Sequence, residues 1–264
     1  MHELFLTASV KQADFDAACA VLQGLSWMTA RRTVYRVLFF AGQPRPGGLP
    51  SAPPPTVVPR RQLWADLGKQ LLRSSYVLQA AYEVSPEADF ARDAGGAAPA
   101  TMDFNRLPAT LRWTDLPDPL RDSPVTSRKK IEVPFLHSLP RALMENKHTY
   151  TNELIQESYS FNRGPLEIVL SRYYHLPDSP PGRPAPHLPA WADLRPVDPA
   201  QKWVLHVKLN VAEDGQPEKL TKANEELMRN KAEFDRLFDF RAVDRRVFDT
   251  RIAPPPVVPG QAPP

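Results

Sequence analysis

The acidic residues are the first candidates for chemistry, because paired carboxylates can hold a metal ion or act as general acid and base. Such a site inside a β-barrel needs two carboxylates at alternate positions of one strand, so that both point inward. Glu132 stands alone in its segment, and Glu167 has no acidic residue two positions away. Glu153 and Glu157 share a predicted strand but are four residues apart. No Glu-x-Glu pair occurs, and we expect structural ion pairs or solvent-facing charges instead.

Motifs of other enzyme classes are missing as well. The sequence has no glycine-rich phosphate loop, no Gly-x-Ser-x-Gly elbow, no His-Glu-x-x-His pair and no cysteine pair. Its 6 histidines are scattered, and His206 stands opposite the apolar face of its predicted strand. We therefore expect no catalytic residue, no cofactor and no metal site. The alternative is a metal-dependent triphosphate-tunnel hydrolase that uses Glu132.

The single cysteine, Cys19, leaves no partner for an internal disulfide and fits a reducing compartment. It lies on the apolar stripe of a predicted helix, and no histidine close in sequence could activate a thiolate. We expect a buried structural cysteine.

Basic and acidic residues nearly balance, with 33 Lys and Arg against 30 Asp and Glu. The densest basic cluster, 128–130, is shorter than the runs that mark polyanion sites, and we expect it on a solvated strand edge. Direct binding to nucleic acid is not predicted. No run of 18 apolar residues and no signal-peptide pattern occurs, so neither membrane insertion nor secretion is predicted.

Apolar residues at every second position predict a series of strands. Their ranges are 3–10, 33–41, 76–84, 111–113, 125–135, 147–161, 166–174 and 203–211, with a last extended piece at 244–252. The Asn-Arg-Gly sequence at 162–164 suits a three-residue hairpin loop with the glycine in the left-handed region.

Apolar residues three or four positions apart predict helices, in the ranges 14–24, 62–71, 139–145 and 220–238. Asp14 can cap the first helix, and Gly24 sits where a helix usually stops.

Together these elements predict a mainly β (α+β) fold, a single antiparallel β-barrel-like domain over 1–253 with a few packed helices. The chain contains 31 prolines, many of them in 42–59 and 177–199, which we interpret as loops inside the domain. A polyproline ligand is the alternative for 42–59. The tail, 254–264, has no residues with which to build a core and is expected to be disordered.

Three blocks of sequence, covering about half of the chain, resemble the fungal Mediator subunit 18 family. The first is Met1 to Val10 with the helix after it and Gln23-Gly24-Leu25. The second is Phe161-Asn162-Arg163-Gly164-Pro165-Leu166-Glu167-Ile168. The third runs from Val204 through Leu220-Thr221-Lys222 to Val243-Asp244-Arg245-Arg246-Val247-Phe248-Asp249-Thr250-Arg251.

The resemblance implies a barrel similar to the tunnel of RNA triphosphatases, without the carboxylate pairs that the active enzymes need. It also implies a non-catalytic structural subunit of the Mediator head module, a nuclear coactivator of RNA polymerase II transcription. The partners it implies are Mediator subunit 20, in a heterodimer, and a helix from the C-terminal part of Mediator subunit 8.

Candidate partner-binding residues are Val21, Leu25, Trp27 and Met28, at the end of the first predicted helix and just beyond it. A partner helix needs apolar side chains that the barrel leaves exposed. Packing in the protein's own core is the alternative for each of the four.

Overall fold

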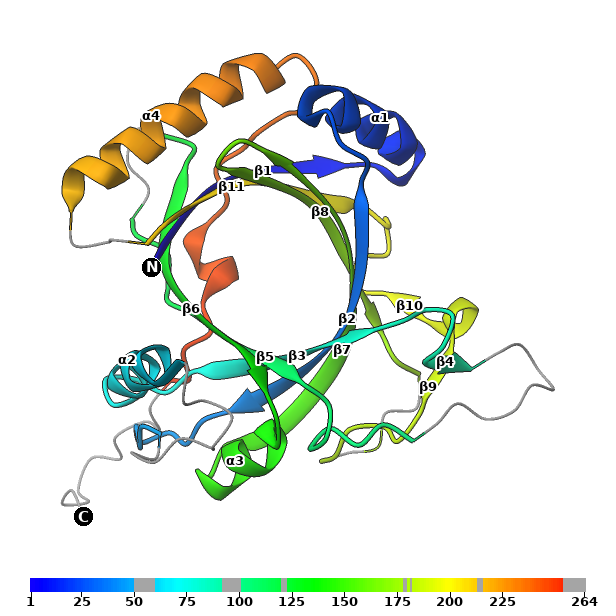
Figure 1. Ribbon diagram of the computed structural model, residues 1–264, viewed down its shortest axis with the longest axis vertical. Coiled ribbons are helices and arrows are strands. Elements are labelled where there is room, and N and C mark those ends of the chain that lie inside the picture. Colours follow the sequence, from blue (N-terminus) through cyan, green and yellow to red (C-terminus); the bar gives the residue numbers. More distant parts are fainter. Residues whose placement is uncertain are drawn as a thin grey trace.

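An antiparallel sheet curls into a closed ring (Figure 1). The computed structural model describes residues 1–49, 60–91, 101–119, 123–177, 180, 182–212 and 216–253. Around the ring the strands are β8 (Leu166–His175), β11 (Trp203–Val211), β1 (His2–Val10), β6 (Thr126–Leu136), β5 (Ala109–Thr114), β3 (Val77–Val84), β2 (Arg31–Ala41) and β7 (Thr149–Arg163). Pairing of β7 with β8 closes the ring. The predicted antiparallel barrel is confirmed.

Three short strands lie outside the ring. β10 (Arg195–Pro196) pairs with the end of β8, and β4 (Phe90–Ala91) pairs in parallel with β9 (Leu188–Ala190). The predicted hairpin between β7 and β8 is confirmed, with Gly164 in the left-handed region at a φ of 58°. Its loop is not the expected 162–164, because Asn162 and Arg163 still pair with Glu167 and Leu166 and only 164–165 connect the strands.

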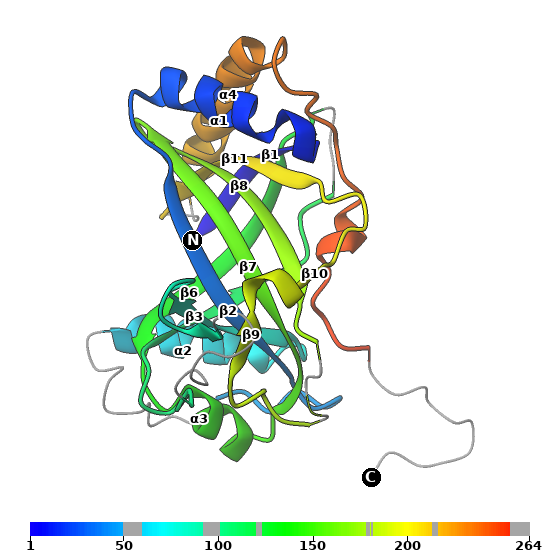
Figure 2. The ribbon, with the colours of Figure 1, turned by 90° about the vertical axis from the view of Figure 1, so that its right-hand side faces the viewer.

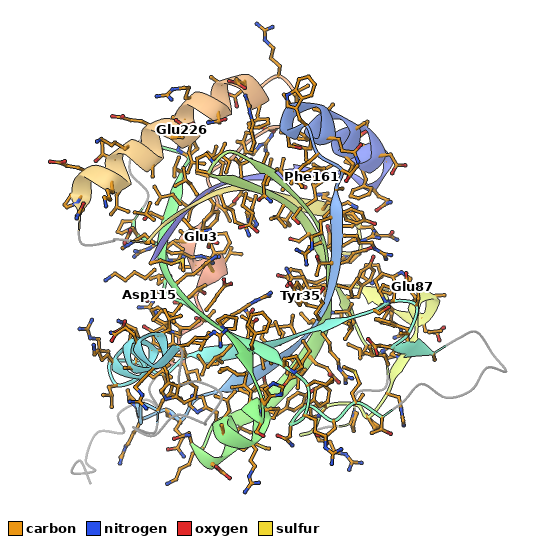
Figure 3. The ribbon with its side chains drawn as sticks, in the orientation of Figure 1. Glu3, Tyr35, Glu87, Asp115, Phe161 and Glu226 are labelled. Atoms are coloured by element: carbon orange, nitrogen blue, oxygen red, sulfur yellow. The ribbon has the colours of Figure 1, made fainter. Side chains whose placement is uncertain are left out.

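Register decides which side chains point into the ring, since directly paired residues share one face of the sheet. Leu4 and Leu6 of β1 belong to a buried cluster outside the ring. Glu3 and Phe5 alternate with them and therefore point to the inside of the ring, the lumen; Glu3 is seen there in Figure 3. The barrel thus keeps its apolar face outward and needs other elements to cover that face.

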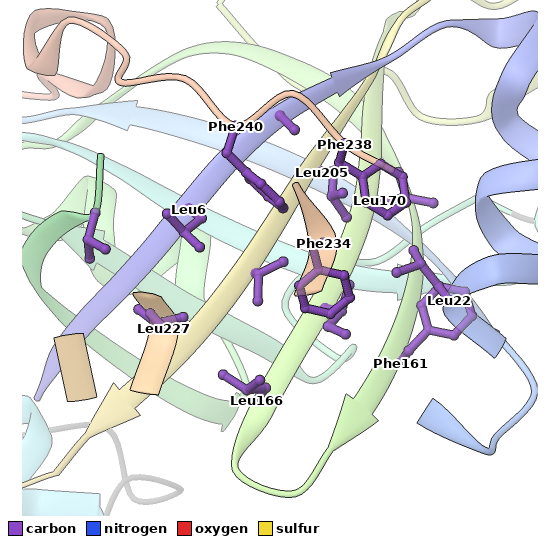
Figure 4. Packing of buried hydrophobic residues seen from close by; sticks show 14 of the residues in the cluster. Leu6, Leu22, Phe161, Leu166, Leu170, Leu205, Leu227, Phe234, Phe238 and Phe240 are labelled. Atoms are coloured by element: carbon purple, nitrogen blue, oxygen red, sulfur yellow. The ribbon is translucent and has the colours of Figure 1, made fainter. Parts of the chain in front are cut away.

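Two helices, α1 (Phe15–Ser26) and α4 (Pro217–Phe234), cover the outer face of β1, β11 and β8 (Figures 1 and 4). Leu22 of α1 and both Leu227 and Phe234 of α4 are fully buried against the strands. This apolar layer is a core in the usual sense, although it lies outside the barrel rather than within it.

Two further helices, α2 (Arg61–Leu71) and α3 (Leu139–Glu145), lie on the opposite side of the ring (Figures 1 and 2). A second apolar cluster there includes Trp64 of α2, Leu143 of α3 and Trp113 of β5. A third cluster joins Ile155 of β7 and Tyr174 of β8 to Leu188 of β9. Part of the proline-rich segment 177–199 therefore covers the outer face of β7 and β8, as the helices cover the other strands.

A buried ion pair holds that proline-rich segment to the barrel. Arg36 of β2 and Glu153 of β7 are both 0% exposed, with Arg36 Nη2 2.6 Å from Glu153 Oε2. Arg36 Nη2 also donates to Ala185 O at 2.7 Å, and the Ala185 N–H donates to Glu153 Oε1 at 2.8 Å. The segment contains β9, a 3-10 turn (η3, Trp191–Asp193) and β10, so the prediction of a plain loop understated its structure.

The C-terminal part of the described chain, 235–252, forms a strap across one end of the barrel (Figure 2). Phe240 of the strap forms an isolated antiparallel bridge with Ala8 of β1, and Val77 of β3 donates its N–H to Thr250 O at 2.7 Å. The predicted helix 220–238 ends at Phe234 instead. The expected extended piece 244–252 contains a 3-10 helix, η4 (Arg245–Phe248), and the Phe248 ring packs edge-on against Phe5 at 5.5 Å between ring centres.

The end of α1 also differs from its prediction. The helix runs past Gly24 to Ser26, and Trp27 adopts the left-handed conformation, with a φ of 54°. Asp14 precedes the helix, within a 3-10 turn (η1, Gln12–Asp14), and its side chain makes no capping hydrogen bond. Of the predicted proline-rich loop 42–59 only 42–49 is described, and the predicted disordered tail lies outside the described residues.

Removing one partner of the buried pair should be costly, because the other charge is then buried without compensation. We expect Arg36→Met to lower the free energy of unfolding by about 3–5 kcal/mol in chemical denaturation. The combination with Glu153→Leu should restore part of the loss. The matched control is Arg163→Met, since the exposed Arg163–Glu233 pair is worth about 0–1 kcal/mol. Equal losses for Arg36→Met and Arg163→Met would contradict the assignment.

Candidate functional site

Trp27 is the most exposed large apolar side chain of the described residues, at 95% exposed. It directly follows α1 in a left-handed conformation that non-glycine residues seldom adopt. The protein therefore holds a large aromatic ring in water on an unfavourable backbone. A ring in this position contributes little to the protein's own stability but is well suited to binding a partner.

The structure brings the four predicted partner-binding residues together but does not treat them alike. Leu25 and Met28 are half-buried and pack against the core beneath α1 and α4. Met28 Sδ also accepts a hydrogen bond from the Asn162 N–H at 3.0 Å. Val21 is half-buried, and only Trp27 projects into solvent. Leu25 and Met28 thus contribute, at least in part, to the protein's own core, which was the alternative to partner binding.

The outward face of α1 completes this surface. Its exposed residues include Ala17, Ala20 and Gly24, and a Cβ atom added at Gly24 would meet nothing within 4 Å. Asp16 is the one charged residue among the 12 of the helix. By contrast, exposed ion pairs such as Arg229–Glu226 run along α4. A surface helix with almost no charge is unusual and permits close approach by another chain.

We call Ala17, Ala20, Val21, Gly24 and Trp27 the α1 surface. Sequence reasoning found Val21 and Trp27 but missed the two alanines and the role of Gly24, which had been interpreted as a helix stop. The signal that could have found them is the scarcity of charge in a helix that must expose one side.

The lumen is the other candidate site, because it gathers inward-facing charges. Arg128 and Lys130 of β6 lie 2.7 Å and 3.1 Å from the buried carboxylate of Glu3. Burial alone would raise the pKa of Glu3, but attraction by Arg128, Lys130 and Lys208 outweighs it and lowers the pKa to about 2. The prediction that 128–130 forms a solvated strand edge is therefore wrong: β6 lies between β1 and β5.

Glu132, the residue of the hydrolase alternative, also faces the lumen. Its carboxylate lies 3.8 Å from Arg112 Nε and 3.6 Å from Lys130 Nζ. Among the described residues, no group of three His, Cys, Asp or Glu side chains is arranged to hold a metal ion. The acidic groups of the lumen are thus paired with cations and not with one another.

Glu153 and Glu157 point outward from β7, where each joins structural ion pairs. Glu157 lies 2.8 Å from Arg32 and 2.9 Å from Arg172 and accepts a hydrogen bond from Tyr174 Oη at 3.0 Å. The prediction of structural ion pairs at these residues is confirmed.

Cys19 is half-buried on α1 and packs against the core. Burial, with a contribution from Asp16, raises the pKa of its thiol to about 11. A thiol with this pKa is hardly ionised at neutral pH, which disfavours the nucleophilic thiolate. No helix of the described chain is long and apolar enough to cross a membrane.

Comparison with known proteins finds relatives along nearly the whole chain. A family model described as Med18 protein matches residues 2–251. The chain is 24% identical over 276 residues to the Mediator of RNA polymerase II transcription subunit 18 of Aspergillus oryzae, covering 95% of this chain and 99% of the relative. It is 26% identical over 275 residues to the protein of the same name from Coccidioides immitis, covering 96% and 100%.

Among solved structures, a chain in the Schizosaccharomyces pombe Mediator head module has a similar fold, with a TM-score of 0.65 and 14% identity. The match covers 92% of this chain and 99% of that chain. It shows that the two chains share a fold.

The lumen predicts a specific acid sensitivity. Burial lowers the pKa of His206 to about 3, with Lys208 and Arg128 adding to this effect and Glu3 opposing it. Below pH 6.5 His206 therefore binds a proton in the unfolded chain but not in the folded one, so the free energy of unfolding decreases as the pH is lowered. We expect His206→Gln to remove about 2 kcal/mol of the stability lost between about pH 7 and 5.

The measurement is chemical denaturation at several pH values between those limits. The same substitution at His137, whose contact with Arg106 is solvent-exposed, is the matched control. If His206→Gln left the slope of stability against pH unchanged, the neutral state of His206 in the folded protein would be refuted.

Proposed function

The chain belongs to the Med18 family, and we propose that it is a non-catalytic structural subunit of the Mediator head module, acting in RNA polymerase II transcription through protein contacts. The observation that carries this proposal is the family match over residues 2–251. Mediator is a nuclear transcription complex, so we assign the chain to the nucleus. No direct contact with nucleic acid or membrane is required for this role.

The proposed partners are Mediator subunit 20, as a heterodimer, and a C-terminal helix of Mediator subunit 8. The α1 surface is the place where we expect one of them to dock. Its small residues allow a second backbone to come close, and Trp27 can fill a pocket on the partner as a binding hot spot. Because α1 also packs on the apolar layer outside the barrel, a partner bound to its exposed side would be held rigidly.

Catalysis is not part of the proposal. In the lumen, Glu3 and Glu132 each contact cations of the same wall. These contacts neutralise the carboxylates with which a metal-dependent hydrolase would bind its metal ion. The hydrolase alternative is therefore set aside in favour of the structural subunit.

Replacing Trp27 by Ala should weaken a partner complex without unfolding the barrel. Loss of a hot-spot aromatic commonly costs 2 kcal/mol or more, so we expect affinity to fall by at least about tenfold. Ala20→Arg should have a similar effect by adding bulk and charge. The measurement is isothermal titration of this chain with subunit 20, and with the subunit 8 segment.

The control is Met144→Ala, which removes a side chain 55% exposed on α3, on the opposite side of the ring. If Trp27→Ala and Ala20→Arg both bound like the unaltered protein, the α1 surface would be rejected, while the family assignment would stand.

A phosphatase assay tests the non-catalytic part of the proposal. We expect no release of phosphate from a nucleoside triphosphate above the buffer rate, with either Mg²⁺ or Mn²⁺ present. Metal-dependent release that disappears in Glu132→Gln, but persists in the control Glu145→Gln on exposed α3, would overturn it.

A further inference from the structure

The excess positive charge of the chain lies in one short segment, 60–73, which consists of α2 and the residues that flank it. The segment contains four cations and one carboxylate, Asp66, and its net charge of +3 equals the net charge of the whole chain. Basic and acidic residues are therefore equal in number in the rest of the sequence. The four cations are Arg60, Arg61, Lys69 and Arg73. A local excess of one charge attracts partners of the opposite charge.

Helix α2 presents this charge to solvent. Its buried side packs Trp64, Leu67 and Leu71 into the second apolar cluster. With 3.6 residues per turn, the side opposite to these three is the one that faces away from the barrel. The exposed residues on that side are Arg61, Gln62, Ala65, Lys69, Leu72 and Arg73. They include three cations and no carboxylate.

Most of these cations have no carboxylate partner. Lys69 Nζ lies 3.0 Å from Asp66 Oδ1, but within the described part of the chain Arg60, Arg61 and Arg73 form no ion pair. The other helices differ, because Arg229 of α4 pairs with Glu226 four bonds of chain away on the same helix face. The positive charge of α2 is thus left open to a carboxylate from another molecule.

Two exposed apolar side chains lie at the ends of this charged face. Phe135, near the end of β6, is 63% exposed and has a φ of 57°, which is strained for a bulky residue. The Arg60 guanidinium lies over the Phe135 ring at 5.2 Å, so this ring sits beside the start of α2. Leu72 directly follows α2 and is 64% exposed. The helix between them is about 16 Å long.

We call Arg60, Arg61, Lys69, Leu72, Arg73 and Phe135 the α2 surface. We propose that it binds a short acidic segment of a partner protein that also carries aliphatic or aromatic side chains. Carboxylates of that segment would meet the unpaired cations, and its apolar side chains would cover Phe135 and Leu72. A span of about 16 Å corresponds to about five residues of extended chain.

The same features disfavour a nucleic acid as the occupant. Nucleic-acid binding depends on many phosphate contacts, and a nucleic acid backbone would leave the aliphatic Leu72 side chain uncovered. The α2 surface lies across the ring from α1 (Figure 1), so a partner on one does not block the other. The inference therefore does not rest on the function proposed for the α1 surface.

The probe is a fluorescently labelled synthetic peptide, rich in aspartate and with leucine at two positions, whose binding to the full chain is followed by anisotropy. We expect saturable binding that weakens as the salt concentration rises from about 0.05 to about 0.5 M, because salt screens exposed charges. A peptide with asparagine in place of aspartate, and one with serine in place of leucine, should each bind at least about fivefold more weakly.

Variants of the chain locate the site. Arg61→Gln combined with Arg73→Gln should weaken binding by about tenfold, at about threefold for each exposed charge pair that is lost. Phe135→Ala should weaken it by about fivefold. The matched controls are Arg236→Gln, an exposed arginine just after α4, and Val247→Ala, 73% exposed in the strap. All these side chains are exposed, so the variants should fold like the unaltered protein.

The proposal is overturned if the aspartate peptide does not bind, or if the asparagine peptide binds equally well. It is also overturned if the two control variants lose as much affinity as the α2 variants do. A single-stranded oligonucleotide with the same net charge as the peptide tests the other class of partner. Tighter binding of the oligonucleotide than of the peptide, lost in the α2 variants, would assign the surface to nucleic acid instead.

Discussion

The closure of the sheet by pairing β7 with β8, over residues 154–163 and 166–175, determines everything else in this molecule. Once the ring is closed, each strand residue points either to the lumen or to the outside, with no free edge between. The chain places its three apolar clusters on the outer face, where ion pairs such as Arg36–Glu153 also lie, and lines the lumen with charges such as Glu3 and Arg128. The hydrophobic free energy of folding therefore depends on elements that cover the outer wall: two pairs of helices and the segment held by the Arg36–Glu153 pair.

This arrangement links stability to the proposed function. A helix that covers the barrel has a second face, and the sequence of that face is free of packing constraints. In α4 the second face carries ion pairs such as Arg229–Glu226, which suits contact with water. In α1 it carries Ala17, Ala20 and Gly24, with Asp16 as the one charge of the helix, and it ends at Trp27. The difference between two helices with the same structural role is the strongest sign that one of them has a further task.

Local patterns were enough to predict most of the strands, because alternation in segments such as 203–211 directly reflects a sheet with one apolar face. Alternation does not say which face is inside, so Arg128 and Lys130 were placed in solvent when they bind Glu3 in the lumen. Nor can it pair Arg36 with Glu153, 117 positions apart. For the site, the position of Trp27 was predicted from its apolar character, but its near-complete exposure depends on where α1 ends.

The central claim is that this barrel is a structural subunit built to hold partner chains. Co-expression with Mediator subunit 20 and the C-terminal segment of subunit 8, followed by size-exclusion chromatography with mass determination, tests it most directly. The account predicts a single species whose mass equals one copy of each chain. A protein that elutes alone, folded and with the mass of a monomer in the presence of both partners would contradict it.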